Sequence, residues 1–477
     1  MSSEAGAGIE GGLANEGSRA GSDRAWLAEL AWSPGLGLRE NVLLEATGEK
    51  FTGVTPEAEG IPAGTIRLAG LTLPGLANAH SHAFHRALRG ITQASRGTFW
   101  TWRERMYEVA ARLDPDSYLA LARAVYGEMT LAGVSCVGEF HYLHHGPGGV
   151  PYADPNEMSR ALIQAASDAG LRISLLDTCY LAGGLSAAGE QLPLAGPQLR
   201  FGDGDSASWA VRMEALGADQ AGALGPHARA GAAIHSVRAV PPGQIPEIVG
   251  WTHHHGAPLH AHLSEQVAEN AACMAAYGGT PAVVLEDAGV LGPRTSLVHA
   301  THLTLQDIDL LGQSRSHACF CPTTEADLAD GIGPARQLAS AGATLTLGSD
   351  SHAVIDLLEE ARRVELGERL ASQERGHFTA AELATAATSA GHASLGWPDA
   401  GHLVPGAMAD LVVVGLDSPR TAGAVRASAL ESAIFGATAS DVRHVVISGR
   451  DVVHNGRHQL LADVPAALAA SIGALLA

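Results

Sequence analysis

Hydrophobic runs of strand length recur through the middle of the chain and alternate with Ala-rich segments that suit helices. Two such helical segments are "DPDSYLALARAVYGEMTLAG" and "DPNEMSRALIQAASDAG". Eight strand–helix units predict a (β/α)8 barrel of about 330 residues, with a doubly wound parallel sheet as the alternative. The predicted strands are residues 76–82, 134–142, 172–180, 232–240, 258–265, 296–302, 317–325 and 343–351.

Both ends of the chain have a different pattern. Short strand-like runs broken by Gly and Pro fill residues 23–73, and similar runs return within 404–460. Turn residues at this short spacing are typical of antiparallel β structure. The two flanks therefore predict one composite β-sandwich domain around a barrel at 74–403, followed by a C-terminal helix at 461–477. Residues 1–22 are small and polar, which favours a disordered tail over a signal peptide.

Composition narrows the choice of partners and location. The 477 residues include 30 Lys and Arg against 50 Asp and Glu, a formal net charge of −20. This excess of acid argues against nucleic acid or an anionic membrane, and leaves an anionic small molecule only if arginines gather locally. No apolar run reaches about 18 residues, so no transmembrane helix is predicted. Five scattered cysteines indicate reduced thiols, and the cytoplasm is the expected location.

Ionisable side chains cluster where the predicted strands end. The first strand ends in His80 and His82, the fifth in His262, and the eighth in Asp350. Residues i and i+2 of a strand point to the same side, and barrel active sites form at the carboxyl ends of the strands. One His-x-His pair is a weak signal by itself. Together, however, the four residues predict a shell of three nitrogens and one oxygen, which suits a catalytic Zn²⁺.

These strings resemble a known family. "LPGLANAHSHAFHRALRG", "PLHAHLSEQ", "LVHATHLT" and "TLGSDSH" look like the amidohydrolase superfamily, and "GHLVPGAMADLVVV" is similar to its composite β domain. Within the superfamily, "TFWTWRERMY", "GEFHYLHH", "HSVRAVPP" and "CPTTEADLADG" resemble the formimidoylglutamate deiminases of histidine degradation. The resemblance covers residues 25–460 or so and implies hydrolysis of N-formimidoyl-L-glutamate to N-formyl-L-glutamate and ammonia. It also suggests a homodimer.

The number of metal ions follows from one residue type. Binuclear members of this superfamily usually bridge two metals with a carboxylated lysine on a strand in the middle of the barrel. Lys50 is the only lysine here and precedes the barrel. Glu139 ends a strand, but its motif fits a structural place better than a bridging one. We therefore expect one divalent metal ion, with Zn²⁺ as its expected identity.

The resemblance also implies catalytic roles. A hydroxide on the single metal ion would attack the formimino carbon. Asp350 would bind the metal and accept the proton of the water, and Glu265 would act as general acid and base on the leaving nitrogen. His299, at the end of the sixth strand, would stabilise the tetrahedral intermediate. Simpler interpretations are a helix N-cap for Asp350 and a first-turn helix charge for Glu265.

A glutamyl group carries two carboxylates, which arginine grips through paired hydrogen bonds. A surface salt bridge remains the alternative for Arg103. His85 stands where we expect Gln in this family, which bears on substrate preference. The predicted substrate-binding residues are Arg103, Tyr142, His235, Arg238 and His85.

Two further histidine runs look less informative. His253, His254 and His255 precede the fifth strand, and adjacent helical residues cannot all face one ion, so a solvated surface run is expected. The same interpretation applies to His144 and His145 in "LHH".

Two other functions stay open. One is an amidohydrolase that deaminates a heterocycle such as guanine, whose pocket would need aromatic stacking and amide hydrogen bonds rather than paired arginines. The other is a metal-free binding or scaffold protein that kept the barrel and lost turnover. Intact candidate ligands argue against the second, and elemental analysis would decide it.

Overall fold

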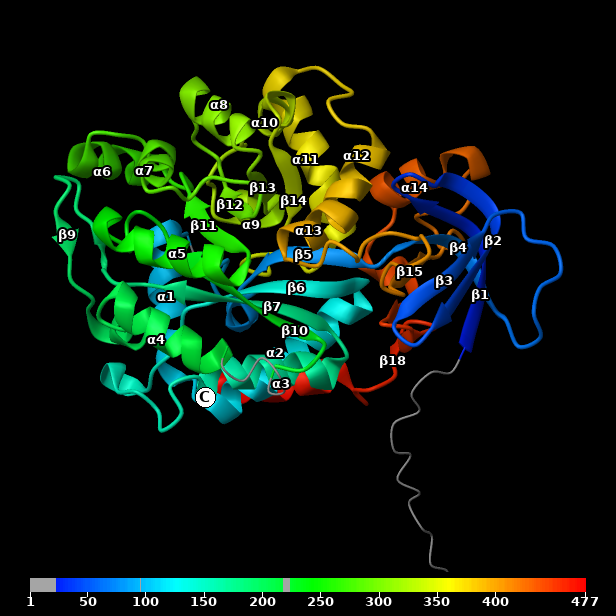
Figure 1. The fold of residues 1–477 in the computed structure, drawn as a ribbon, viewed down its shortest axis with the longest axis horizontal. Coiled ribbons are helices and arrows are strands. Elements are labelled where there is room, and N and C mark those ends of the chain that lie inside the picture. Colours follow the sequence, from blue (N-terminus) through cyan, green and yellow to red (C-terminus); the bar gives the residue numbers. More distant parts are fainter. Residues whose placement is uncertain (1–22, 95, 218–223) are drawn as a thin grey trace, which may run out of the picture.

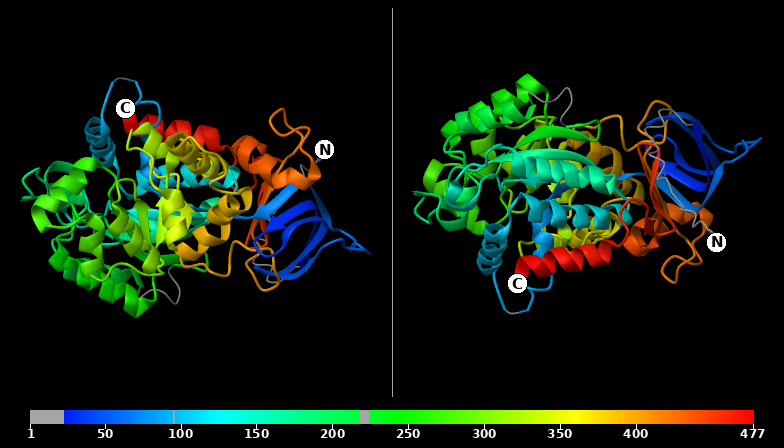
Figure 2. Two further views of the ribbon diagram at one scale, coloured as in Figure 1. Left: turned by 90° about the horizontal axis from the view of Figure 1, so that it is seen from above. Right: turned by 90° about the horizontal axis from the view of Figure 1, so that it is seen from below.

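The structure, a computed structural model, describes residues 23–94, 96–217 and 224–477. Two eight-stranded sheets dominate it, with one further two-stranded sheet (Figure 1). The barrel and its helices form the larger part of the molecule, and the second large sheet lies at one end of the long axis (Figure 2). The predicted tail at residues 1–22 falls outside the described residues.

The barrel consists of eight parallel strands, each overlapping one predicted run. Strands pair in the order of the chain. A parallel bridge between Ser81 and Asp350 brings the last strand beside the first, so the sheet is nearly closed. The (β/α)8 prediction is therefore confirmed, and the doubly wound alternative was wrong. The strands are β5 (Leu76–Ser81), β6 (Val134–His141), β7 (Arg172–Cys179), β10 (Ala228–Ile234), β11 (Leu259–Leu263), β12 (Thr295–His299), β13 (His317–Phe320) and β14 (Thr344–Leu347).

Helices surround the barrel (Figure 1). Local sequence explains where they begin: before α2, Asp114 accepts a hydrogen bond from the backbone N–H of Ser117 and Pro115 takes the first helical position. The α-helices are α1 (Phe99–Arg112), α2 (Pro115–Leu131), α3 (Glu157–Ala169), α4 (Ser206–Gly217), α5 (Ile245–His255), α6 (Val267–Tyr277), α7 (Pro281–Asp287), α8 (Leu305–Gln313), α9 (Pro322–Asp327), α10 (Ala335–Ala341), α11 (Leu357–Ser372), α12 (Ala380–Thr385), α13 (Gly391–Ser394), α14 (Ala429–Gly436) and α15 (Val464–Leu476). None of the helices in the described ranges is long and apolar enough to cross a bilayer.

The second sheet joins the two ends of the chain. Strand β15 from the C-terminal flank pairs antiparallel with β4 from the N-terminal flank, and β4 runs parallel to β1. Side chains from both flanks, such as Trp26 and Leu411, share an apolar cluster separate from the barrel core. In sheet order the strands are β18 (Arg457–His458), β17 (Arg450–His454), β16 (Val442–Ile447), β15 (Leu411–Val414), β4 (Ile66–Pro74), β1 (Asp23–Ser33), β2 (Gly37–Thr47) and β3 (Lys50–Thr55).

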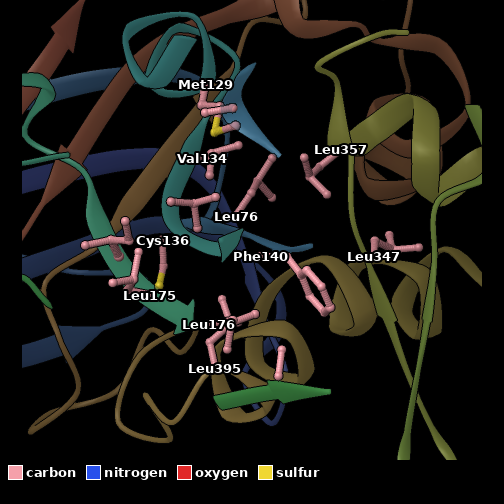
Figure 3. Close-up of a cluster of buried hydrophobic side chains, with 14 of the residues drawn as sticks. Leu76, Met129, Val134, Cys136, Phe140, Leu175, Leu176, Leu347, Leu357 and Leu395 are labelled. Atoms are coloured by element: carbon pink, nitrogen blue, oxygen red, sulfur yellow. The ribbon is translucent and has the colours of Figure 1, made fainter. Parts of the chain in front are cut away.

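A packed core and one buried ion pair hold the barrel in place against this sheet. Leu76, Val134 and Leu175 belong to the apolar cluster drawn in Figure 3. At the amino end of β7, Arg172 donates hydrogen bonds of 2.5 and 2.6 Å to the carboxylate of Asp410, next to β15. Both side chains are buried, so loss of either one would leave an unpaired charge in the core. The pair therefore links the amino end of the barrel strands to the second sheet.

Candidate metal and catalytic site

Four predicted ligands converge at the carboxyl ends of the barrel strands. Nitrogen or oxygen atoms of His80, His82, His262 and Asp350 all lie within 4.8 Å of one another, and all four side chains are buried. The Oδ1 atom of Asp350 lies 3.3 Å from Nε2 of His80 and 3.4 Å from Nε2 of His82. The Nε2 atoms of His80 and His262 are 3.2 Å apart. His80 lies on β5 and His82 directly follows it, so the i and i+2 spacing places both imidazoles inside the barrel, as expected.

The outer hydrogen bonds of these histidines test whether a cation fits. His82 Nδ1 lies 2.9 Å from the carbonyl oxygen of Phe140, and His262 Nδ1 lies 2.9 Å from that of His235. A carbonyl oxygen only accepts, so each Nδ1 carries the hydrogen and each Nε2 presents a lone pair to the centre. Such lone pairs, crowded beside a carboxylate, fit a divalent ion.

The protonation states suit the same ion. Burial lowers the pKa of His82 to about 3 and that of His262 well below its usual value, so both imidazoles are neutral. Burial alone would raise the pKa of Asp350, but its hydrogen bond with His80 and the other nearby histidines hold that pKa below its usual range. Neutral imidazoles with an ionised carboxylate are the donor set that zinc prefers.

Asp350 sits in an unusual backbone conformation. Its φ is +42°, a left-handed value that costs a non-glycine residue about 1–3 kcal/mol and is often found at functional sites. Asn78 on β5 holds the preceding residue, because its side chain accepts from the N–H of Ser349 at 2.9 Å and donates to Ser349 Oγ at 2.7 Å. Asn78 had no predicted role, yet its i−2 spacing from His80 could have pointed to the barrel interior.

Two predicted proton carriers lie beside the four ligands. His299 Nε2 is 3.8 Å from Glu265 and 3.9 Å from Asp350 Oδ2, and its Nδ1 is 3.4 Å from Glu325. Burial raises the pKa of Glu265. Burial would lower the pKa of His299, but Glu265 and the other carboxylates raise it well above its usual value. Glu265 and His299 can therefore hold a proton beside the four candidate ligands. Glu325 lies in the "CPTTEADLADG" string, but sequence reasoning gave it no role.

The predicted substrate-binding residues line one pocket next to this centre. The pocket contains about 480 Å³ of space, part of it open to solvent. Arg238 forms ion pairs with Glu269 at 3.1 Å and Glu265 at 3.5 Å. The guanidinium of Arg103 lies 4.5 Å from the ring centre of Trp100 on α1. Lining residues include Arg103, Tyr142, His235, Arg238 and His85.

His85 lines the pocket and contacts Tyr142, which also lines it. Its Nε2 lies 2.9 Å from the phenol oxygen of Tyr142, and its ring centre is 4.5 Å from that of His82. Burial lowers the pKa of His85 well below its usual value, so the ring is neutral. A neutral His85 therefore orients the Tyr142 hydroxyl beside the candidate metal ligands.

The prediction for the "LHH" run was wrong. His144 and His145 are buried, with His144 Nε2 2.9 Å from the carbonyl oxygen of Thr178 and His145 Nε2 3.0 Å from Asp203. Arg212 explains the burial, because it pairs with Asp203 and Asp177 and so supports a polar network inside the fold. By contrast, His253 and His254 are exposed at the end of α5.

Glu139 accepts hydrogen bonds from Ser81 Oγ and the N–H of Ala83, next to the candidate ligands.

Comparison with known proteins identifies the group to which this arrangement belongs. The sequence model of the amidohydrolase family matches residues 71–452, most of the chain. This chain is an amidohydrolase. Formimidoylglutamate deiminase from Pseudomonas aeruginosa is 36% identical, over 91% of this chain and 95% of that one. The 8-oxoguanine deaminase of the same organism is 29% identical, over 74% and 76%. This amidohydrolase is thus a hydrolase of carbon–nitrogen bonds.

Solved structures agree with the fold. An amidohydrolase from Brucella melitensis superposes with a TM-score of 0.87 at 32% identity, covering 95% of this chain and all of that one. An adenosine deaminase from Xanthomonas campestris with bound zinc gives 0.81 at 22% identity, with 95% and 98% covered. The second likeness supports the fold alone.

Proposed function

We propose that this amidohydrolase converts N-formimidoyl-L-glutamate and water to N-formyl-L-glutamate and ammonia, as a step of histidine degradation. The observation that carries the proposal is a pair of arginines, Arg103 and Arg238, in the pocket that three of the four candidate ligands also line. The 36% identity to a formimidoylglutamate deiminase supports the same substrate.

His80, His82, His262 and Asp350 would hold one divalent ion, for which zinc is the proposed identity. When bound, such an ion acts as a Lewis acid and lowers the pKa of a water from 15.7 to about 7. Asp350 then has two tasks, since its Oδ1 faces the histidines and its Oδ2 faces His299 and can accept a proton from the attacking water. Neutral imidazoles leave the ligand set with a single negative charge.

Glu265 would move the proton that releases ammonia. Burial raises its pKa, which favours the protonated carboxyl that can donate to the imino nitrogen. The carbon–nitrogen bond then breaks, ammonia leaves, and the formyl product remains. His299, held from behind by Glu325, would donate a hydrogen bond to the oxygen that adds to the formimino carbon.

The glutamyl part would occupy the arginine side of the pocket. Arg238 and Arg103 offer planar donors for its two carboxylates, and Tyr142 and His235 offer further hydrogen bonds. His85 would act through Tyr142, whose hydroxyl it orients. A homodimer and a cytoplasmic location remain parts of this proposal, to be checked by light scattering and by cell fractionation.

Deamination of a heterocycle is the second candidate. Phe99, Trp102 and Tyr180 line the pocket and could stack on a flat ring. An ammonia-release assay with purified, metal-analysed protein separates the two functions. We expect turnover of N-formimidoyl-L-glutamate and none of guanine or 8-oxoguanine. The opposite preference would replace the proposed substrate.

A further inference from the structure

A second set of potential metal ligands shares Asp350 with the first. One atom each from His299, Cys321 and Asp350 lie within 4.8 Å of one another, and all three residues are buried. His299 ends β12, Cys321 follows β13, and Asp350 follows β14, so three neighbouring strands supply them. Cys321 has no part in the proposed reaction and does not line the substrate pocket.

Asp350 belongs to both sets, and its two oxygens lie near different histidines. Its Oδ1 lies 3.3 and 3.4 Å from His80 and His82, whereas its Oδ2 lies 3.9 Å from His299 Nε2. A carboxylate that faces two groups of donors in this way can bridge two cations. The first set would keep its ion while the second set accepts another.

Glu325 fixes the other two members of the second set. Its Oε1 accepts a hydrogen bond of 2.9 Å from the N–H of Cys321 and lies 3.4 Å from His299 Nδ1. This contact turns His299 Nε2 towards Asp350. Gly348 leaves room for the thiol, because a Cβ there would lie 3.0 Å from Cys321 Sγ. The three donors are thus positioned by the fold.

We propose that His299, Cys321 and Asp350 form a second, inhibitory site for a soft divalent ion such as Cd²⁺ or excess Zn²⁺. Sulfur, imidazole and carboxylate donors together favour these ions over Mg²⁺ or Ca²⁺. On binding, the Cys321 thiol and any proton on His299 Nε2 are released to solvent, and the thiolate sulfur bonds to the ion. Inhibition rests on the proposed function, because the ion would occupy His299 and the free oxygen of Asp350. Binding of the second ion does not depend on the proposed function.

Titration of the one-ion enzyme with Cd²⁺ tests the site directly. We expect a second ion per chain, an ultraviolet thiolate–cadmium absorption band, and loss of ammonia release as the band grows. Cys321→Ser should abolish the band and keep basal activity. It should also raise the inhibitory Cd²⁺ concentration by about tenfold or more, because even loss of an outer partner of a ligand costs about 10- to 100-fold in metal affinity. Cys136→Ser, at another buried cysteine, is the matched control and should behave as wild type.

The outcomes are separable. No band in wild type at saturating Cd²⁺, or an equal band in Cys321→Ser, would overturn the second site. If Cys321→Ser does not fold, Cys321→Ala replaces it and must meet the same test. A band that appears in an enzyme with no formimidoylglutamate activity would reject the proposed substrate and leave the second site standing.

Discussion

Arg238→Gln separates two roles of this arginine, stabilising the pocket and binding substrate. The wild-type guanidinium lies 3.1 Å from Glu269 and 3.5 Å from Glu265. At an effective dielectric constant of about 20, unit charges 3.1 Å apart attract by about 5 kcal/mol. Because the Glu269 side chain is only 1% exposed, removing its partner leaves a buried charge. We therefore expect the variant to lose about 3–5 kcal/mol of unfolding free energy.

The substrate effect is worked out separately. Losing a charged hydrogen-bond donor to a carboxylate costs about 2–4 kcal/mol, which is a decrease of about 30- to 1000-fold in kcat/KM for N-formimidoyl-L-glutamate. Most of this change should appear in KM, because the contact exists in both ground and transition states. N-methylformamidine, which lacks carboxylates, should lose much less.

Arg238→Gln combined with Glu269→Gln decides between the two roles. This pair of changes removes both buried charges, so most of the lost stability should return, while kcat/KM for N-formimidoyl-L-glutamate should stay low. Urea unfolding gives the first quantity and ammonia release the second. If the double variant recovers activity together with stability, or if N-methylformamidine loses as much as the anionic substrate, Arg238 does not bind the glutamyl carboxylates.

Three further changes test other parts of the site and fold. Glu265→Gln should lower kcat by about 10²- to 10⁴-fold and keep the metal, as measured by ammonia release and elemental analysis; a small change would remove its acid–base role. Asn78→Ala should weaken metal affinity by about 10- to 100-fold in a competition titration with a chelator, because Ser349 loses its partner; unchanged affinity would show that Asp350 is held without it. His392→Gln tests pH dependence: burial lowers the pKa of His392 from 6.5 to about 4, so the folded chain binds fewer protons there and stability falls as pH falls through this window. The stability advantage of wild type over the variant should drop by about 1.6 kcal/mol from pH 6.5 to 5, measured by urea unfolding, and a constant difference would contradict this.

The barrel and its site could be predicted from two sequence features. These were the spacing of the hydrophobic residues and the position of ionisable residues at the ends of the predicted strands. His80 and His82 could be placed on one face of a strand because side chains alternate along it. Asp350 was predicted from its position after the eighth hydrophobic run. Its φ of +42° was not, because that conformation depends on contacts with β5 that are distant in sequence.

The missed features share a physical cause. His144 and His145 lie in a loop, and loop residues are usually expected to be exposed. Both are buried here because they pack beside Arg212 and Asp203, which are distant in sequence. Glu269 and Glu325 likewise act through partners on other elements. Strand β10 begins at Ala228, earlier than the predicted residue 232, because "ARAGA" is too weakly apolar to mark a strand. The spacing of hydrophobic residues predicts which side of a helix or strand is buried. The roles of these residues depend instead on packing between elements that are distant in sequence.

Metal content per chain, measured for wild type, His262→Ala and His260→Ala, tests the central claim most directly. His260 is the matched control, since it lies two residues earlier on the same strand and contacts the carbonyl oxygen of Ser394 instead. We expect one tightly bound divalent ion in wild type and in His260→Ala, and its loss together with activity in His262→Ala. Full metal content and turnover in His262→Ala would contradict a site built on His80, His82, His262 and Asp350.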